Sequence, residues 1–123
     1  MAATPATLVS GDWKMGNLGW HPDGRSVVLD QAYPGEGPGC WDLGWYLALN
    51  RARLPISKDE TVEWYRETME SCGVDTSAWF AQQIELCLLG IAVCFGWEKA
   101  LGDADELAWW TARADAAVAH LDG

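Results

Sequence analysis

The sequence predicts an α+β fold, mostly helical, in which a short β-hairpin and its flanking loops pack on about four helices. Residues 1–39 are rich in Gly and Pro and alternate apolar with polar positions, whereas residues 40–123 show helical spacing and contain only Pro55. Half of the 123 residues are hydrophobic, so the chain can bury one core without disulfides. We expect a single domain, with a loop and hairpin segment over 1–39 and a helical subdomain over 40–123.

The hairpin is the first expected element. Its first strand, Leu18–Trp20, precedes the turn sequence His21–Gly24, and a β-rich run, Arg25–Asp30, follows the turn. Because the two strands are antiparallel, Asn17 before the first strand and Asp30 at the end of the second should be neighbours.

Four helices are expected after the hairpin. The second opens with the capping box Ser57–Glu60 and closes at Gly73, and Asp103 caps the fourth. The helices and their expected inward-facing residues are, in order, about Cys40–Arg53 with Trp41, Trp45 and Leu49, widened by Leu43, Leu47 and Leu54; the helix after Ser57 with Val62, Tyr65, Met69 and Cys72; about Ser77–Gly102 with Ile84, Leu88, Ile91 and Phe95; and the helix after Asp103 with Leu107, Trp110, Ala114, Val118 and Leu121.

Charge and hydropathy exclude several classes of function. The chain has 8 Lys+Arg against 18 Asp+Glu, a formal net charge of −10, which repels nucleic-acid phosphates and anionic lipid. The longest apolar stretch, Ile84–Trp97, is shorter than a bilayer span. No signal-peptide pattern opens the chain, so a cytoplasmic protein is predicted. The four cysteines lack the spacing of a zinc site and are expected to be buried thiols: Cys40, Cys72, Cys87 and Cys94.

Three oxygen-bearing side chains in the first segment point to a chemistry. Asp12 lies in a loop, Asn17 follows five residues later, and Asp30 ends the hairpin. Such a set suits Mg²⁺, a hard cation that takes one or two carboxylates together with phosphate oxygens. Asp12 would then accept a hydroxyl proton while Asn17 and Asp30 hold the metal, with the spacing found in the catalytic loop of protein kinases. Taken singly, Asp12 would be an ordinary loop carboxylate and Asp30 a turn residue at the end of a strand.

Further motifs extend this pattern. Ser10-Gly11-Asp12 with Asn17 is followed by Val28-Leu29-Asp30, and then by a Gly/Pro-rich turn that leads into Asp42-Leu43 on a helix. Over Leu8–Arg53 the chain resembles the C-terminal lobe of the aminoglycoside phosphotransferase and choline kinase-like family, and the helices beyond are similar to that family's substrate-binding subdomain.

The resemblance implies a kinase-like C-terminal lobe and a role for each motif residue. Asp12 would be the catalytic base, Asn17 and Asp30 would be Mg²⁺ ligands, and Asp42 would be a buried brace of the catalytic loop. A satisfied structural acceptor is the alternative for Asp42, because a buried carboxylate needs hydrogen-bond donors, which nearby loop amides can supply.

The sequence departs from the family's pattern at three points. Ser10 replaces the family's His before Gly-Asp, and we group it with Asp42 as a structural residue. Gln31 follows Asp30 where an aromatic residue is usual, and is a candidate phosphate or substrate contact. Seven residues before Leu8 leave no room for the lobe that covers ATP, so the implied cofactor is Mg²⁺, whereas ATP binding is not expected of the chain alone.

Other charged residues have two interpretations. Lys14 would face either a phosphate or solvent. Glu85 and Glu98 would either hold a cationic substrate, as acidic residues of the family's helical subdomain do, or form salt bridges to Arg51 or Arg53.

Three functional hypotheses therefore stay open. The chain is a truncated lobe that is no ATP-dependent kinase on its own and keeps a pocket for a small, cationic or amphipathic molecule. Alternatively, it is a Mg²⁺-dependent phosphotransferase acting on a small-molecule hydroxyl and completed by a partner chain or a dimer. In the third hypothesis it is a homo-oligomeric lobe with unrelated chemistry in a cleft formed by some of its nine tryptophans.

Overall fold

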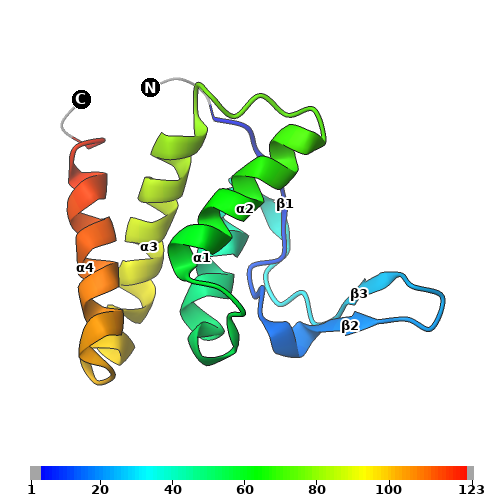
Figure 1. Ribbon diagram of the computed structural model, residues 1–123, viewed down its shortest axis with the longest axis horizontal. Helices are drawn as coiled ribbons and strands as arrows, with labels where there is room; N and C mark the ends of the chain where they lie inside the picture. Colours follow the sequence, from blue (N-terminus) through cyan, green and yellow to red (C-terminus); the bar gives the residue numbers. More distant parts are fainter. Residues whose placement is uncertain (1–3, 122–123) are drawn as a thin grey trace.

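The computed structural model describes residues 4–121 and confirms an α+β architecture that is mostly helical (Figure 1). Residues 1–3, part of the stretch searched for a signal peptide, lie outside the described residues. The elements in chain order are β1 (Thr7–Val9), the 3₁₀ turn η1 (Met15–Asn17), β2 (Leu18–Trp20), β3 (Ser26–Val28), β4 (Gly35–Gly37), α1 (Gly39–Leu49), the 3₁₀ turn η2 (Arg51–Arg53), α2 (Lys58–Ser71), α3 (Phe80–Ala100) and α4 (Ala104–Val118).

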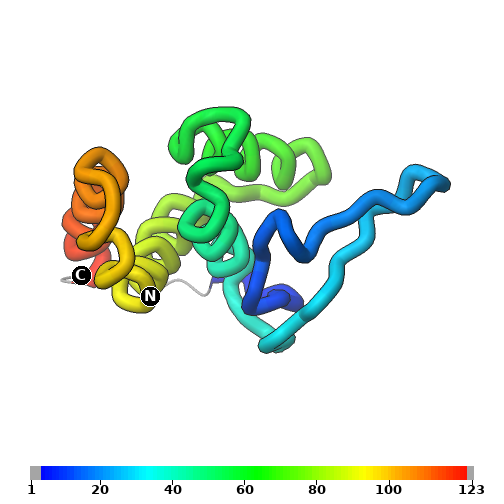
Figure 2. Tube along the Cα trace, turned by 90° about the horizontal axis from the view of Figure 1, so that it is seen from below, coloured from blue at the N-terminus to red at the C-terminus, as the bar shows by residue number. Residues whose placement is uncertain are grey.

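The predicted hairpin forms, but it does not sit among the helices. Strands β2 and β3 pair antiparallel, with Leu18 opposite Val28. The hairpin projects from the body as an arm, visible in two perpendicular views (Figures 1 and 2). Residues 20–26 of the arm are all exposed. The expectation that the hairpin packs on the helices is therefore wrong, since its three-residue strands carry no apolar face wide enough to be buried.

A second two-stranded sheet was not expected from the sequence. Strand β1 pairs antiparallel with β4, and Leu8 lies opposite Glu36. The alternation in Thr7–Val9 is too short to signal a strand, and β4 consists of Gly, Glu and Gly, which carry little β-propensity. This pairing closes the segment between the two strands into a loop that begins and ends beside α1.

The core lies between α1 and α3 and extends to α4. Gly44 on α1 allows the close approach to α3, because a Cβ at this position would lie 2.8 Å from Ile91 Cγ1. The fully buried side chains at the centre are Leu47, Leu88, Ile91 and Cys40. By length and composition α3 could cross a membrane, and it is longer than the apolar stretch of the sequence suggested. One of its faces nevertheless packs on α1 and α4 as a core helix does.

Several helix predictions need correction. The helix expected to reach Arg53 ends at Leu49, because the Asn50 side chain donates to the Tyr46 carbonyl oxygen at 2.9 Å and the chain then turns into η2. Leu49 itself is exposed. Cys72 and Cys94 are also exposed, since the end of α2 and the outer side of α3 have no cover among the described residues.

The inward face of α4 is rotated from the expected one. Trp110 is buried as predicted, but Leu107, Val118 and Leu121 are exposed. The charged Glu106 is buried in their place, since Lys58 and Lys99 pair with it. The two predicted caps are confirmed: the capping box of α2 makes both of its hydrogen bonds, and the Asp103 side chain accepts from the first-turn N–H groups of α4.

Candidate functional site

The Asp12 carboxylate lies at the centre of a polar cluster between η1 and α1. Lys14 Nζ is 2.8 Å from Asp12 Oδ2, and Asn17 Nδ2 donates to the same oxygen at 3.1 Å. From α1, Trp45 Nε1 donates to Asp12 Oδ1 at 3.0 Å. Three donors thus fix the orientation of the carboxylate.

These contacts also set the charge state of the cluster. The hydrogen bond from Lys14 lowers the pKa of Asp12, with burial opposing and the bonds from Trp45 and Asn17 adding to the effect. The hydrogen bond to Asp12 raises the pKa of Lys14, and the charge of Asp30 adds to that rise. Near neutral pH the site therefore holds an ionised carboxylate beside a protonated amine.

Asn17 and Asp30 are neighbours, as the antiparallel hairpin predicts. The Leu29 N–H donates to the Asn17 carbonyl oxygen at 2.8 Å, and Asn17 Nδ2 lies 3.4 Å from the Asp30 carbonyl oxygen. Asn17 is buried, whereas Asp30 is exposed and has a positive φ of 51°. A left-handed backbone costs energy in a residue other than Gly, so the end of the hairpin is held in a sharp bend beside Asn17.

Asp42 holds the start of the same loop. Its carboxylate accepts the N–H of Ser10 at 2.7 Å and that of Gly11 at 3.0 Å. Asp42 is half-buried rather than buried. Gly11 has a φ of +74°, and a Cβ there would lie 2.7 Å from the Tyr33 carbonyl oxygen, so only glycine fits between α1 and the segment after the hairpin.

Ser10 is held by its backbone, and its hydroxyl makes no hydrogen bond with a described residue. The residue is 6% exposed, and Ser10 Oγ is buried without a hydrogen-bond partner among the described residues. Its carbonyl oxygen accepts the Tyr33 N–H at 3.3 Å. The backbone of Ser10 thus ties the loop to α1 and to the 31–39 segment.

Two residues that contribute to the site were not predicted from the sequence. Trp45 was expected only as a core residue, yet its indole N–H binds Asp12. Asn50 accepts the Met15 N–H at 3.0 Å through Oδ1 and so fixes η1 on the end of α1. An Asn that ends a helix was the available signal for the second contact, and a Trp at helical spacing gave no signal for the first.

The other candidate contacts lie elsewhere. Gln31 is exposed and makes no side-chain hydrogen bond with the described residues. Glu85 pairs with Arg113, with Arg113 Nη1 3.3 Å from Glu85 Oε1, and Glu98 pairs with Lys99, 2.8 Å from Glu98 Oε2. Salt bridges were one expected outcome for the two glutamates, but their partners are on α3 and α4 rather than Arg51 or Arg53.

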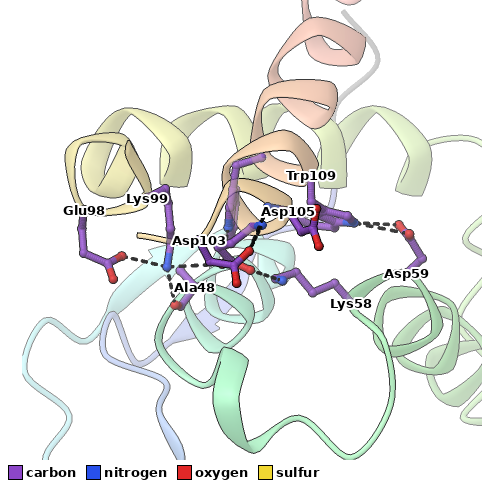
Figure 3. A network of polar contacts seen from close by, with 10 residues as sticks. Ala48, Lys58, Asp59, Glu98, Lys99, Asp103, Asp105 and Trp109 are labelled. Carbon is purple, nitrogen blue, oxygen red and sulfur yellow. Dashed lines mark hydrogen bonds and ion pairs between the residues drawn. The ribbon is translucent and has the colours of Figure 1, made fainter. Parts of the chain in front are cut away.

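A second charged cluster, unforeseen from the sequence, joins the helices (Figure 3). Lys99 is 2% exposed, and its Nζ donates to the Ala48 carbonyl oxygen at 2.8 Å. It lies 3.4 Å from Glu106 Oε1, which also accepts the Trp110 indole N–H at 2.8 Å. Lys58 pairs with the other oxygen of Glu106. We call Lys58, Glu98, Lys99, Glu106 and Trp110 the interhelical cluster.

The residues around Asp12 fit a Mg²⁺ ion by their chemistry. Residues 4–121 contain no group of three His, Cys, Asp or Glu side chains placed to hold a metal. Asn17 Oδ1 and the Asp30 carboxylate accept no hydrogen bond from a described residue, and the two residues are neighbours, with Asn17 Nδ2 3.4 Å from the Asp30 carbonyl oxygen. One carboxylate with one amide oxygen is a sufficient protein share for an ion that also takes phosphate oxygens and water.

Comparison of the chain with protein-family models, with curated proteins and with solved structures finds no match.

Proposed function

We propose that the chain forms the catalytic lobe of a small-molecule phosphotransferase, with the kinase-like C-terminal lobe that the aminoglycoside phosphotransferase resemblance implies. The observation that carries the proposal is the placement of the Asp12 carboxylate, which Lys14, Asn17 and Trp45 hold in one orientation beside the bend at Asp30. Phosphoryl transfer depends mainly on positioning and electrostatics, and a fixed carboxylate beside an amine supports both.

In this proposal Asp12 accepts the proton of the acceptor hydroxyl. Its lowered pKa keeps it ionised, and Asp42 keeps its loop in place by accepting the amides of Ser10 and Gly11. Lys14 is half-exposed beside Asp12 and would turn toward a phosphate without leaving the cluster. Asn17 and Asp30 would hold Mg²⁺, which when bound supplies positive charge to the phosphate oxygens.

The nucleotide-binding side has to come from elsewhere. The strands among residues 4–121 form two-stranded sheets, and neither is large enough to cover a nucleotide. A partner chain or a second copy would complete the site by covering the face around Asp12 and the arm. The chain alone is therefore expected to transfer no phosphoryl group from ATP at a measurable rate.

Calorimetric titration with Mg²⁺ and ATP, separately and together, tests the metal part of the proposal. We expect Mg²⁺ to bind weakly, ATP to add little because the chain alone lacks a nucleotide-binding side, and Asp30→Asn to abolish the Mg²⁺ heat. Asp23→Asn, in the exposed turn of the arm, is the matched control and should leave the binding unchanged. No heat in any titration of the wild-type chain would contradict the proposal.

Small-molecule binding without phosphoryl transfer is the second candidate. The observation that favours it is a mostly apolar hollow of about 490 Å³ between α1, α2 and β1, which is within the usual range for ligand pockets. Binding of small amphipathic molecules that is independent of Mg²⁺ and ATP would support this candidate.

A further inference from the structure

We infer that this hollow, on a face of α1 next to the one that carries Trp45, binds an amphipathic amine and that the bound amine acts on the catalytic loop through Asp42 and Trp13. The inference deepens the binding role proposed above and rests on it. It does not depend on phosphoryl transfer.

The residues that line the hollow indicate which kind of apolar group, here called the body of the ligand, it would bind. Four aromatic residues from three parts of the chain line the hollow, together with aliphatic residues and threonines. These aromatic residues are Trp13, Tyr46, Trp64 and Tyr65. Trp64 is 65% exposed, so much of its surface is free to contact a bound molecule. A flat aromatic or alkyl body would bury this exposed surface.

The charge of Asp42 indicates which kind of polar group, here called the head of the ligand, the hollow would bind. Among the described residues that line it, Asp42 alone is charged. Its partners are the backbone N–H groups of Ser10 and Gly11, so the carboxylate has no counter-ion among the described residues. Each carboxylate oxygen can accept a second hydrogen bond, so a protonated amine can bind without displacing either amide. An anionic head would be repelled.

The two tyrosine hydroxyls of the hollow carry no charge, so Asp42 is the charged group that a ligand meets there. Burial, with the charge of Asp42 adding to it, raises the pKa of Tyr65 to about 12, and burial also raises the pKa of Tyr46. Both hydroxyls therefore stay protonated over the physiological range. A Cβ at Gly39 would lie 2.9 Å from Tyr65 Oη, so this glycine allows the hydroxyl to sit against the first turn of α1.

The hollow differs from the Asp12 site in position but shares its framework. On α1, Asp42 and Tyr46 are four residues apart and line the hollow, whereas Trp45 reaches Asp12 from a neighbouring face of the helix. Trp13 lines the hollow and directly follows Asp12 in the chain. An amine bonded to Asp42 and stacked on Trp13 would thus act on the Asp12 loop from both ends without touching Asp12.

The test uses three ligands with one body and different heads: naphthylmethylamine, naphthylmethanol and naphthoate. Calorimetry on the whole chain, without Mg²⁺ or ATP, measures their affinities. We expect the amine to bind at least about tenfold more tightly than naphthoate, with naphthylmethanol between them. Equal affinities for the three would overturn the role of Asp42.

Two matched tryptophan variants locate the binding. Trp64→Ala removes a ring that is 65% exposed and lines the hollow, whereas Trp97→Ala removes a ring that is 68% exposed and does not. We expect the first to weaken amine binding about tenfold and the second to leave it within about twofold. Equal effects would place the amine elsewhere and overturn the site while leaving the binding role intact. Circular dichroism of both variants checks that they fold.

The effect on the catalytic loop has its own readout. The Trp45 indole N–H bonds Asp12, so its NMR resonance, assigned with Trp45→Phe, reports the loop. We expect this resonance to shift when the amine binds and to shift less in the Trp64→Ala variant at the same amine concentration. A Trp45 resonance that does not shift when the amine binds would overturn the proposed effect of the amine on the loop, whatever the Mg²⁺ and ATP titrations show.

Discussion

The polar cluster of Asp12, Lys14, Asn17 and Trp45, here called the Asp12 cluster, contains the same kinds of charged groups as the interhelical cluster. The two clusters differ in how exposed their charges are and in how many partners each charge has. In the interhelical cluster the side chains of Lys99 and Glu106 are 2% and 5% exposed, and each has more than one partner. In the Asp12 cluster the Lys14 side chain is 40% exposed, and Asp30 nearby is exposed with no ion-pair partner among the described residues.

Under the proposed function, this difference in exposure separates a structural role for the interhelical cluster from a chemical role for the Asp12 cluster. Buried charges that are fully paired have no capacity left for a ligand, and removing one partner leaves the other uncompensated. Half-exposed charges contribute little to stability but stay available to a metal or a substrate. The two clusters therefore should respond in opposite ways to substitution, with stability lost in one and binding in the other.

Glu106→Gln should have the largest effect on stability. Lys58 and Lys99 would lose their shared carboxylate, and the buried Lys99 amine would keep only the half-exposed Glu98 as its counter-ion, which is costly. We expect the free energy of unfolding to fall by about 3 kcal/mol in urea denaturation. Asp105→Asn, one residue earlier and exposed, is the control and should change it by less than about 0.5 kcal/mol. Similar losses in the two variants would remove the distinction between the clusters.

Asp42→Ala should have the next largest effect, because it acts on the joint between the loop and α1. The N–H groups of Ser10 and Gly11 would lose a charged acceptor. We expect a loss of about 2 kcal/mol in the same urea assay. Hydrogen exchange should speed up at these two amides more than in α3. Uniform exchange across the chain would show that Asp42 supports the fold as a whole instead of this loop.

Acid should act on both clusters in the same direction. Burial raises the pKa of Glu106, but the bonds from Lys58 and Trp110 and the charges of both lysines outweigh it, so the folded pKa lies below the ordinary 4.5. Asp12 likewise lies below its ordinary 3.8. A carboxyl with a lowered folded pKa stabilises the protein above its unfolded pKa, and this contribution is lost as pH falls through the folded value.

The measurement is the urea midpoint from neutral pH to about pH 3. Stability should be level above about pH 5 and fall below the ordinary value of Glu106. Glu106→Gln should flatten this fall more than Asp12→Asn does, because Glu106 is the more buried group. A steeper fall in Glu106→Gln than in the wild type would contradict the sign of the shift.

Asp12→Asn should change stability least. An asparagine keeps one oxygen for Trp45 or Asn17, and the lost pairing with Lys14 is half-exposed. We expect a change within about 1 kcal/mol, while any activity regained with a completing partner should disappear. Full activity in this variant would exclude Asp12 as the base.

The sequence predicted the parts of the fold that rest on local signals. The hairpin, both caps and the neighbouring positions of Asn17 and Asp30 follow from turn residues, capping residues and strand pairing. The β1–β4 pairing and the burial of Lys99 did not follow, because both depend on contacts between residues far apart in the chain. No local pattern distinguishes a buried lysine from a solvated one.

The same division holds for the candidate site. The loop residues Asp12 and Asn17 were found by their spacing, which is a local property. Trp45 and Asn50 reach the loop from α1, and only the folded arrangement shows that an indole N–H and an amide oxygen point at the loop. The rotation of α4 has the same origin, since Glu106 is drawn inward by a lysine on α2 and another on α3.

The projecting arm is the part of the chain where cleavage and insertion should be tolerated best. Its tip, around Asp23-Gly24, is exposed and is held by contacts within the turn, such as Gly24 N–H to the His21 carbonyl oxygen at 2.9 Å. Loop tips of this kind accept insertions and are the first places that proteases cut. Trypsin should therefore nick the chain after Arg25 before it reaches the helices, and a reporter sequence inserted at the tip would leave the helical body folded.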